Sequence, residues 1–182
     1  SGLVTVPPVG AVTAGPVTPL ASYLVGPGVI ESTATAITGE LHDVSSTGFS
    51  FDYNIPVGSS AWGGGILVFN AVTGGGVPIR PDLTSGNLIF EVSGTGTLRV
   101  SVSDDVVVGT NPDGTPKYRS VTLLFTGIDA TKKFIAISKT DLLKAALDFG
   151  FDTITSVSFI VDKTVATGTG TVVVKSSGLV TV

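Results

Sequence analysis

Oxygen-bearing side chains gather in one short stretch of the chain, at Asp104, Asp105, Asn111 and Asp113. Carboxylate and amide oxygens are the ligands that Ca²⁺ prefers, so this stretch predicts a calcium site. Its spacing does not match an EF-hand loop, and Asn and Asp are also ordinary turn residues. Two interpretations therefore stay open, a bound Ca²⁺ ion or a turn that needs no ion.

A second candidate site surrounds Trp62, the only tryptophan. The small residues at 59–65 predict an exposed loop, in which an indole ring can lie against the face of a sugar. Asp52, Asn54 and Arg80 are the polar side chains that could hold sugar hydroxyls beside it. The alternative is that Trp62 plugs one end of the fold or forms a contact between subunits.

Catalytic chemistry has little support in this sequence. His42 is the only imidazole, and no nucleophile-elbow sequence accompanies it. The adjacent carboxylates Asp104 and Asp105 could do acid–base work, but paired acidic residues at a strand end are usually solvated or hold a cation. The glycine triplets at 63–65 and 74–76 lack the Gly-Lys-Ser/Thr of a phosphate loop. They predict tight turns or close backbone approach between copies, and we expect no enzyme.

Composition narrows the partners and the compartment. The net charge is −4 with only 13% charged residues, and no basic stripe is present, so we expect no nucleic-acid partner. The first thirty residues carry no charge, but repeated Pro and Gly argue against a membrane span. The chain has no Cys and no Met, which excludes disulfides and thiolate chemistry and fits an extracellular or cell-surface protein.

One hexapeptide, Ser-Gly-Leu-Val-Thr-Val, occurs both at 1–6 and at 177–182. Such a repeat predicts either one unit of a covalent head-to-tail array or a subunit that exchanges terminal strands with its neighbours. The partner would then be further copies of this chain. The expected interface residues are Leu3, Val4, Val6, Leu179, Val180 and Val182.

Strands must position these candidates, because Val, Thr and Gly dominate the composition. Alternation is cleanest at 49–55, where Phe49, Phe51 and Tyr53 share one face. The runs 87–92 and 98–103 predict a hairpin with inward sets Leu88, Phe90, Val92 and Leu98, Val100, Val102. Further strands are expected at 20–25, 29–41, 66–70, 118–126, 133–138, 156–161 and 171–174.

One short helix is expected after Ser138 or Thr140, with Asp141 in its first turn and Gly150 beyond its end. Residues 111–114 predict a turn. The whole pattern predicts an all-β fold, an antiparallel two-sheet sandwich of the jelly-roll kind. Its domain would occupy 20–176, preceded by an extended linker or exchanged strand at 1–19 and followed by a next repeat or terminal strand at 177–182.

The order of elements over roughly 29–175 resembles the galactose-binding-like jelly rolls that include many carbohydrate-binding modules of secreted glycosidases. The segments that carry the likeness are 49–53, the loop with Trp62, 88–92, 98–102, the helix-containing loop before 154–159, and 169–174. The final segment lacks the Asp-rich strand common in such modules. Only Glu31 and Asp162 occupy places similar to their calcium ligands, so the resemblance supports the fold more than a ligand.

Two functions follow from these patterns. The first is a non-catalytic extracellular subunit or repeat that assembles head to tail into a surface fibre, a layer or an adhesin stalk. The alternative is a carbohydrate-binding module of a secreted enzyme or adhesin, which would bind polysaccharide.

Overall fold

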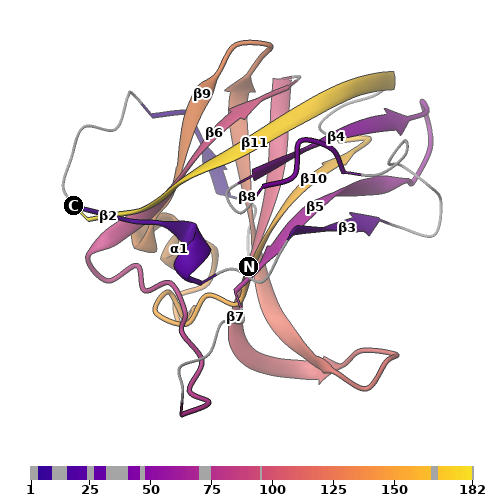
Figure 1. Cartoon of the computed structure of the whole chain (residues 1–182). Coiled ribbons are helices and arrows are strands. Elements are labelled where there is room, and N and C mark those ends of the chain that lie inside the picture. Colours follow the sequence, from indigo (N-terminus) through magenta and orange to yellow (C-terminus); the bar gives the residue numbers. More distant parts are fainter. Residues whose placement is uncertain are drawn as a thin grey trace.

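Strands occupy most of the chain, because apolar and polar residues alternate along it. The computed structural model describes residues 4–9, 16–23, 27–31, 41–45, 48–69, 75–94, 96–164 and 168–181. Its strands form two sheets, labelled in Figure 1. Sheet A has the order β1 (Val4–Val6), β8 (Pro116–Ile128), β7 (Gly96–Thr110), β10 (Ser156–Asp162), β5 (Trp62–Val68) and β3 (Pro27–Glu31). Sheet B has the order β2 (Val17–Thr18), β11 (Gly168–Thr181), β6 (Gly86–Ser93) and β9 (Lys133–Ile137), with β4 (Gly48–Ile55) also paired to β11.

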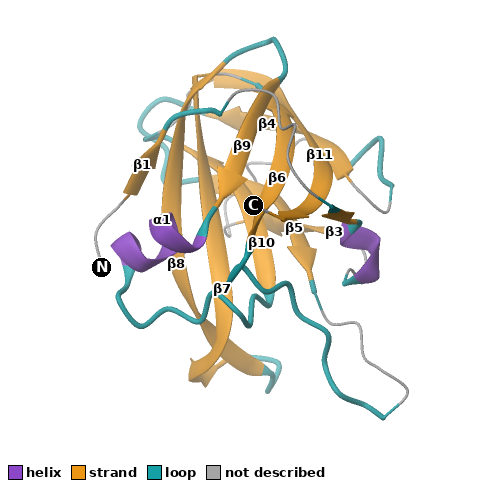
Figure 2. Cartoon of the chain, turned by 90° about the vertical axis from the view of Figure 1, so that its left-hand side faces the viewer, coloured by secondary structure: helices purple, strands orange, loops and turns teal. Residues whose placement is uncertain are grey.

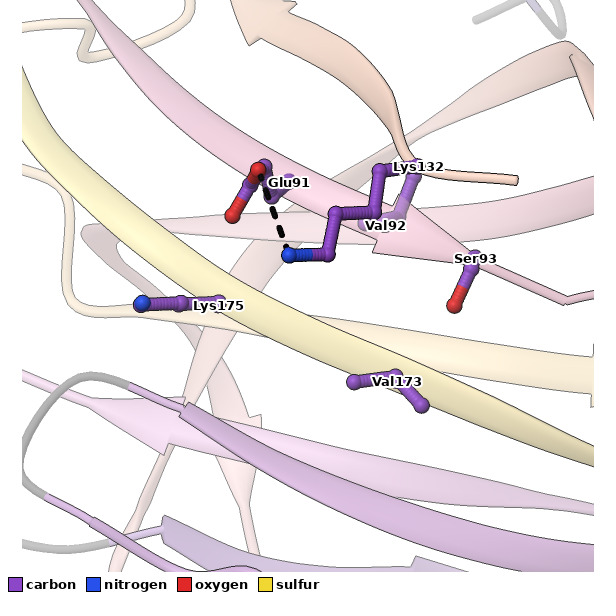
Figure 3. A pocket seen from close by; sticks show the side chains of 6 residues that line it. All are labelled: Glu91, Val92, Ser93, Lys132, Val173 and Lys175. Atoms are coloured by element: carbon purple, nitrogen blue, oxygen red, sulfur yellow. Dashed lines mark ion pairs between the residues drawn. The ribbon is translucent and has the colours of Figure 1, made fainter. Parts of the chain in front are cut away.

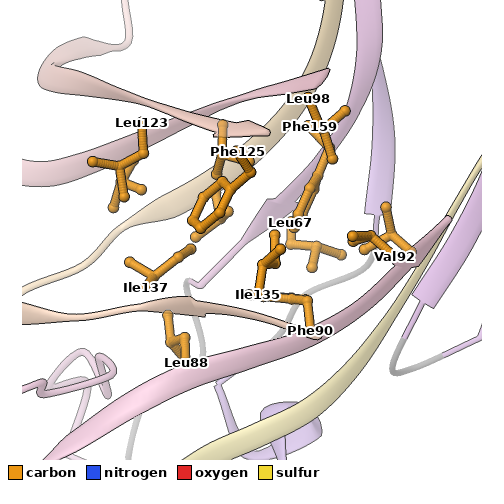
Figure 4. Close-up of a cluster of buried hydrophobic side chains, with 14 of the residues drawn as sticks. Leu67, Leu88, Phe90, Val92, Leu98, Leu123, Phe125, Ile135, Ile137 and Phe159 are labelled. Atoms are coloured by element: carbon orange, nitrogen blue, oxygen red, sulfur yellow. The ribbon is translucent and has the colours of Figure 1, made fainter. Parts of the chain in front are cut away.

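The core lies between the two sheets and confirms the predicted inward positions. Phe49, Phe51 and Tyr53 on β4 are buried, as the alternation predicts. Figure 4 shows Leu98, Leu123 and Phe159 of sheet A facing Leu88 and Phe90 of sheet B. Phe159 packs edge-on against the Phe90 ring, with 4.9 Å between ring centroids, so it contacts both layers. The predicted two-sheet β-sandwich is confirmed; among the described strand pairs, β1 with β8 is parallel and the rest are antiparallel.

The hairpin expected between 87–92 and 98–103 is wrong. The two segments form strands, but β6 pairs with β11 and β9 in sheet B, whereas β7 pairs with β8 and β10 in sheet A. The short link at 94–96 therefore crosses from one sheet to the other. Both arrangements bury the same apolar side chains, so alternation alone does not distinguish them.

The strand expected at 20–25 is also wrong over its described part. Residues Leu20–Ser22 form a 3₁₀ turn that begins after Pro19, with the amide of Tyr23 donating to the carbonyl of Leu20. Leu20 and Tyr23 are buried, so the apolar character of the segment serves packing rather than sheet pairing. The strand expected at 29–41 is seen as β3, and 32–40 lie outside the described residues.

Trp62 opens β5 instead of lying in a loop, and residues 63–65 continue that strand. A Cβ on Gly64 would lie 1.7 Å from the carbonyl oxygen of Phe159, and one on Gly65 would lie 2.1 Å from the Phe49 ring. Glycine is required there because neighbouring atoms of the same chain approach so closely. Of the other triplet, 74–76, Gly74 lies outside the described residues, while Gly75 and Gly76 lie in a turn after β5.

The predicted helix is present as α1 (Lys139–Ala145). The Ser138 hydroxyl accepts a hydrogen bond from the amide of Asp141, which is the N-cap interaction that the sequence predicts. Figure 2 shows α1 beside β8 and β1, and Leu142 buries its side chain in the core.

Candidate functional site

The outer face of sheet A combines polar side chains with an aromatic one, Trp62. Its side chains alternate with buried ones along each strand, as Trp62, Ile66 and Val68 do along β5. In the centre, Ser158 of β10 lies opposite Ser101 of β7, and the next pair along is also two serines. The face includes Trp62, Ile66, Val68, Arg99, Ser101, Ser103, Ser120, Thr122, Leu124, Ser156, Ser158, Ile160 and Asp162.

A pocket at one end of this face contains Trp62. It has a volume of about 250 Å³, and its lining includes Trp62, Arg99, Asp162 and Ser101. Trp62 lies directly opposite Asp162 in the β5–β10 register. We name it the Trp62 pocket.

An ion pair holds the polar groups of the Trp62 pocket. Asp162 Oδ2 lies 3.3 Å from Nε of Arg99, and the Arg99 guanidinium also donates to the Thr164 hydroxyl at 3.0 Å. Both charged side chains are largely buried, with side-chain exposures of 28% for Arg99 and 19% for Asp162. Nε of Arg99 has no hydrogen-bond acceptor with good geometry in the described part of the chain. The pocket thus combines an indole ring with a charge-compensated donor and acceptor.

A second, larger pocket occupies the other end of the same face. Its volume is about 470 Å³, and it lies between the end of β5 and the tip of the β7–β8 hairpin, which extends beyond the rest of the sheet in Figure 1. Arg80 and Tyr118 are in its walls, and we name it the Arg80 pocket. Its other lining residues are Ile66, Val68, Asn111, Thr115, Pro116, Thr155 and Ser156. Six residues separate Trp62 from Val68 along β5, so the two pockets span about 20 Å of one face.

The pockets described on the outer face of sheet B are smaller, and the larger of them, about 180 Å³, lies beside Gly48 and Lys175. The smaller one, of about 120 Å³, lies among Glu91, Lys132, Val173 and Lys175. Figure 3 shows Lys132 reaching across to Glu91, with 4.0 Å between the charged atoms. This pocket has no aromatic side chain in its lining, so we base the candidate site on sheet A.

The structure does not bring the four predicted sugar-site residues together. Trp62 and Arg80 lie in different pockets of sheet A. Asp52 and Asn54 lie on β4 in sheet B, opposite Thr171 and Thr169 of β11. Alternation along β4 directs Asp52 and Asn54 away from the core, as the sequence predicts, but they lie on the outer face of sheet B and not beside Trp62 on sheet A.

Asp52 instead belongs to a small exposed cluster with His42. Nε2 of His42 lies 3.4 Å from Asp52 and Nδ1 lies 3.1 Å from Asp43. The hydrogen bond to Asp43, with a further contribution from Asp52, raises the pKa of His42. The hydroxyl of Thr171, and then His42, lowers the pKa of Asp52.

The four predicted calcium ligands are also kept apart. Asp104 is fully buried and accepts hydrogen bonds from Arg119 Nε at 2.9 Å and from the amide of Gly150 at 2.9 Å. Its other carboxylate oxygen accepts from the amide of Val106 at 3.1 Å. The guanidinium of Arg119 therefore balances this carboxylate, and its pKa is raised chiefly by the same Asp104.

The remaining three predicted ligands lie away from this ion pair. Asp105 is exposed on the next position of β7, and Asn111 follows six residues later, about 20 Å along a strand. Asp113 accepts from the amide and hydroxyl of Thr115, which lowers the pKa of Asp113. The turn at 111–114 is confirmed, and in the described ranges no three His, Asp or Glu side chains come together as metal ligands.

The expected assembly residues lie in the sheets of their own chain where they are described. Val4 and Val6 belong to β1, which pairs with β8, and Val6 is buried. Leu179 and Val180 belong to β11, and they pair with both β6 and β2. Leu3 and Val182 lie outside the described residues. Assembly between copies through these segments stays a prediction.

No protein-family model matches the sequence, and no curated protein matches it. Among solved structures, the chain is similar to the family 11 carbohydrate-binding module of the cellulosomal cellulase Lic26A-Cel5E of Clostridium thermocellum. The identity is 14% over 93% of this chain and 97% of that one, with a TM-score of 0.58. A family 30 carbohydrate-binding module is similar at 16% identity over 88% and 95%, with a TM-score of 0.52.

At these identities the likeness is one of fold. The chain therefore has the jelly-roll β-sandwich of these modules, and the resemblance seen in the sequence is confirmed. None of the described helices is long and apolar enough to cross a membrane.

Sequence reasoning missed most of the polar residues of the candidate site. No sequence motif marks Arg99, Ser101, Ser158 or Tyr118 as binding residues, and Asp162 is named only for its likeness to a calcium ligand. A usable signal was present, because Arg99 and Ser101 alternate with inward residues and must point outward. Alternation does not show which strands pair, so it cannot place β7, β10 and β5 side by side.

Proposed function

We propose that this chain is a non-catalytic polysaccharide-binding module whose binding surface is the outer face of sheet A. The observation that carries the proposal is the Trp62 pocket, where an indole ring lies beside the Arg99–Asp162 pair. Sugars present a weakly apolar C–H face and a rim of hydroxyls. An aromatic ring suits the first, and a carboxylate with a guanidinium suits the second.

The shape of the surface supports a chain ligand. Two pockets lie on one face and span about 20 Å. The serines between them are small, so an extended oligosaccharide can lie flat on the strands and exchange hydrogen bonds with their hydroxyls. The fold shared with the family 11 and family 30 modules agrees with this proposal.

A binding role fits the face better than hydrolysis. Glycosidases generally use two carboxylates flanking the bond that they cleave. In the described linings of the two sheet A pockets, Asp162 is the one carboxylate, and Arg99 holds it in an ion pair. We place the activity outside the cell or at its surface, where polysaccharides are found.

The test is affinity electrophoresis through gels that contain soluble polysaccharides, including a neutral β-glucan. We expect retardation of the intact chain, its loss in Trp62→Ala, and partial retention in Trp62→Phe, which keeps a ring. Trp62 points away from the core, so thermal unfolding of Trp62→Ala should stay close to that of the parent. Absence of retardation across the whole panel would overturn the proposal.

A further inference from the structure

The two pockets of sheet A differ in charge balance. In the Trp62 pocket, Asp162 compensates Arg99 at 3.3 Å. In the Arg80 pocket, Arg80 is the one charged residue of the described lining, and no described carboxylate lies within 4.0 Å of it. One end of the face is therefore neutral overall, and the other end is positive.

Arg80 is held in place by its neighbours in the chain. One of its guanidinium nitrogens donates to the carbonyl oxygen of Phe69 at the end of β5. Pro81 and Leu83, just after it, are buried, and the amide of Leu83 donates to the carbonyl of Phe151 at 2.9 Å. A partly buried guanidinium anchored at one nitrogen leaves its other N–H groups for a ligand in a fixed direction.

The other groups of the Arg80 pocket suit a sugar rather than a bare ion. Tyr118 gives an aromatic wall, and Ser156 brings a hydroxyl. The hydroxyls of Thr115 and Thr155 also lie in the lining, where they donate to Asp113 and to the carbonyl of Asp104. The volume of about 470 Å³ is far more than a small anion needs. Guanidinium recognises planar carboxylates and the oxygens of sulfate esters through paired, charge-assisted hydrogen bonds.

We infer that the Arg80 pocket selects a sugar unit carrying an anionic group, a carboxylate or a sulfate ester, within the polysaccharide that the chain binds. This rests on the proposed function and adds to it the chemical class of the ligand. The chain as a whole is acidic, with a net charge of −4. General attraction to polyanions is therefore disfavoured, and preference for a charged glycan requires a local cation such as Arg80.

The experiment compares one cellulose backbone with three substituents: the neutral hydroxyethyl cellulose, the carboxylated carboxymethyl cellulose and the sulfated cellulose sulfate. Polygalacturonate is added as a polymer in which each sugar carries a carboxylate. The parent chain should bind at least one charged polymer about tenfold or more tightly than the neutral one. One pair of charge-assisted hydrogen bonds supplies a difference in affinity of this size. The preference should fall as salt rises. Comparison of the carboxylated polymers with the sulfated one identifies which anion the pocket prefers.

Two substitutions at Arg80 and one control isolate the pocket. Arg80→Gln should remove the preference for the charged polymer, because the charge-assisted contact is lost. Binding of the neutral polymer should change less than about twofold, because that polymer has no anionic group to make this contact. Arg80→Lys keeps the charge and should retain part of the preference, which also shows that the pocket still folds. Lys175→Gln makes the same change in net charge on the outer face of sheet B and should leave the preference unchanged.

The outcomes separate this inference from the proposed function. Binding of neutral and charged polymers with equal affinity, or an equal loss of both in Arg80→Gln, overturns the anionic pocket and leaves the polysaccharide site at Trp62 standing. A preference lost equally in Lys175→Gln also overturns it, because net charge would then be the cause. Failure of the parent to bind any polymer overturns the proposed function itself.

Discussion

Removing the Asp104 carboxylate should destabilise the fold more than almost any other single change at a polar residue. Asp104 is completely buried, and its two oxygens accept hydrogen bonds from Arg119 and from the amides of Gly150 and Val106. These bonds join β7 to β8 and to the loop that follows α1. In Asp104→Ala, all three donors lose their acceptor at once.

The magnitude follows from those contacts. Breaking a buried ion pair by removing one partner costs about 3–5 kcal/mol. Arg119 keeps a second carboxylate, Asp148, at 3.0 Å, and its side chain is 20% exposed, so part of its charge stays compensated. We therefore expect a loss at the low end, about 3 kcal/mol in the free energy of unfolding. With a urea m-value of about 2 kcal/mol/M, the midpoint should fall by about 1.5 M.

The assay is urea unfolding followed by circular dichroism, with Asp105→Ala as the matched control. Asp105 is the neighbouring carboxylate and is exposed, so its removal should change stability by less than about 0.5 kcal/mol. Adding a chelator to the parent should leave the urea midpoint unchanged. If Asp104 and Asp105 held a calcium ion instead, the chelator and the loss of either carboxylate would each lower the midpoint. A loss below about 1 kcal/mol in Asp104→Ala would refute the reasoning, because a buried charge pair cannot be that weakly coupled.

Three further predictions concern other parts of the fold. Gly64→Ala should destabilise the fold by about 2 kcal/mol or more, because the added Cβ would meet the backbone of β10. Gly109→Ala is the control and should be tolerated, because no atom lies closer than 3.9 Å to its Cβ. Thermal unfolding of the two variants measures the difference. Val6→Asp should lower the melting temperature clearly, since Val6 is buried against the core, whereas an unchanged melt would show that β1 is dispensable. By NMR titration, His42 should have a pKa above about 6.5, and Asp52→Asn should lower it; a pKa that does not move would remove Asp52 from the cause. The raised pKa of His42 contributes stability that is complete below about pH 6.5 and is lost as the pH rises through the pKa of His42 in the folded state. The lowered pKa of Asp52 contributes stability that is lost as the pH falls through the pKa of Asp52 in the folded state.

Local features were predictable from the sequence because their causes are local. Alternation at 49–55 assigns Phe49 and Phe51 to the core, and Ser138 with Asp141 marks the start of α1. The turn at 111–114 needs only the side chains of its own residues. In each case the physical interaction involves residues a few positions apart, so the sequence contains both partners.

The arrangement of the strands and the composition of the site depend on distant residues. β6 and β7 are adjacent in the chain, yet they lie in different sheets, because β6 pairs with β9 and β11 whereas β7 pairs with β8 and β10, all of them later in the sequence. Trp62 meets Asp162, one hundred positions later, through the β5–β10 register. The sequence predicts a cation site at Asp104 because its neighbours in the chain are other oxygen-bearing side chains. Its partner in the fold, Arg119, lies on another strand and is not visible from these neighbours.

The two ends of the chain would resist a pulling force unequally. β1 is joined to sheet A by three residue pairs with β8, whereas β11 pairs with β6 along one edge and with β4 and β2 along the other. Under a pulling force, β1 should peel away first, at a low load, while β11 holds. The strands β5, β7, β8 and β10, whose side chains line the two pockets, keep their pairings with one another when β1 leaves. The amino-terminal end of the chain should therefore extend while the face that carries the Trp62 and Arg80 pockets keeps its shape.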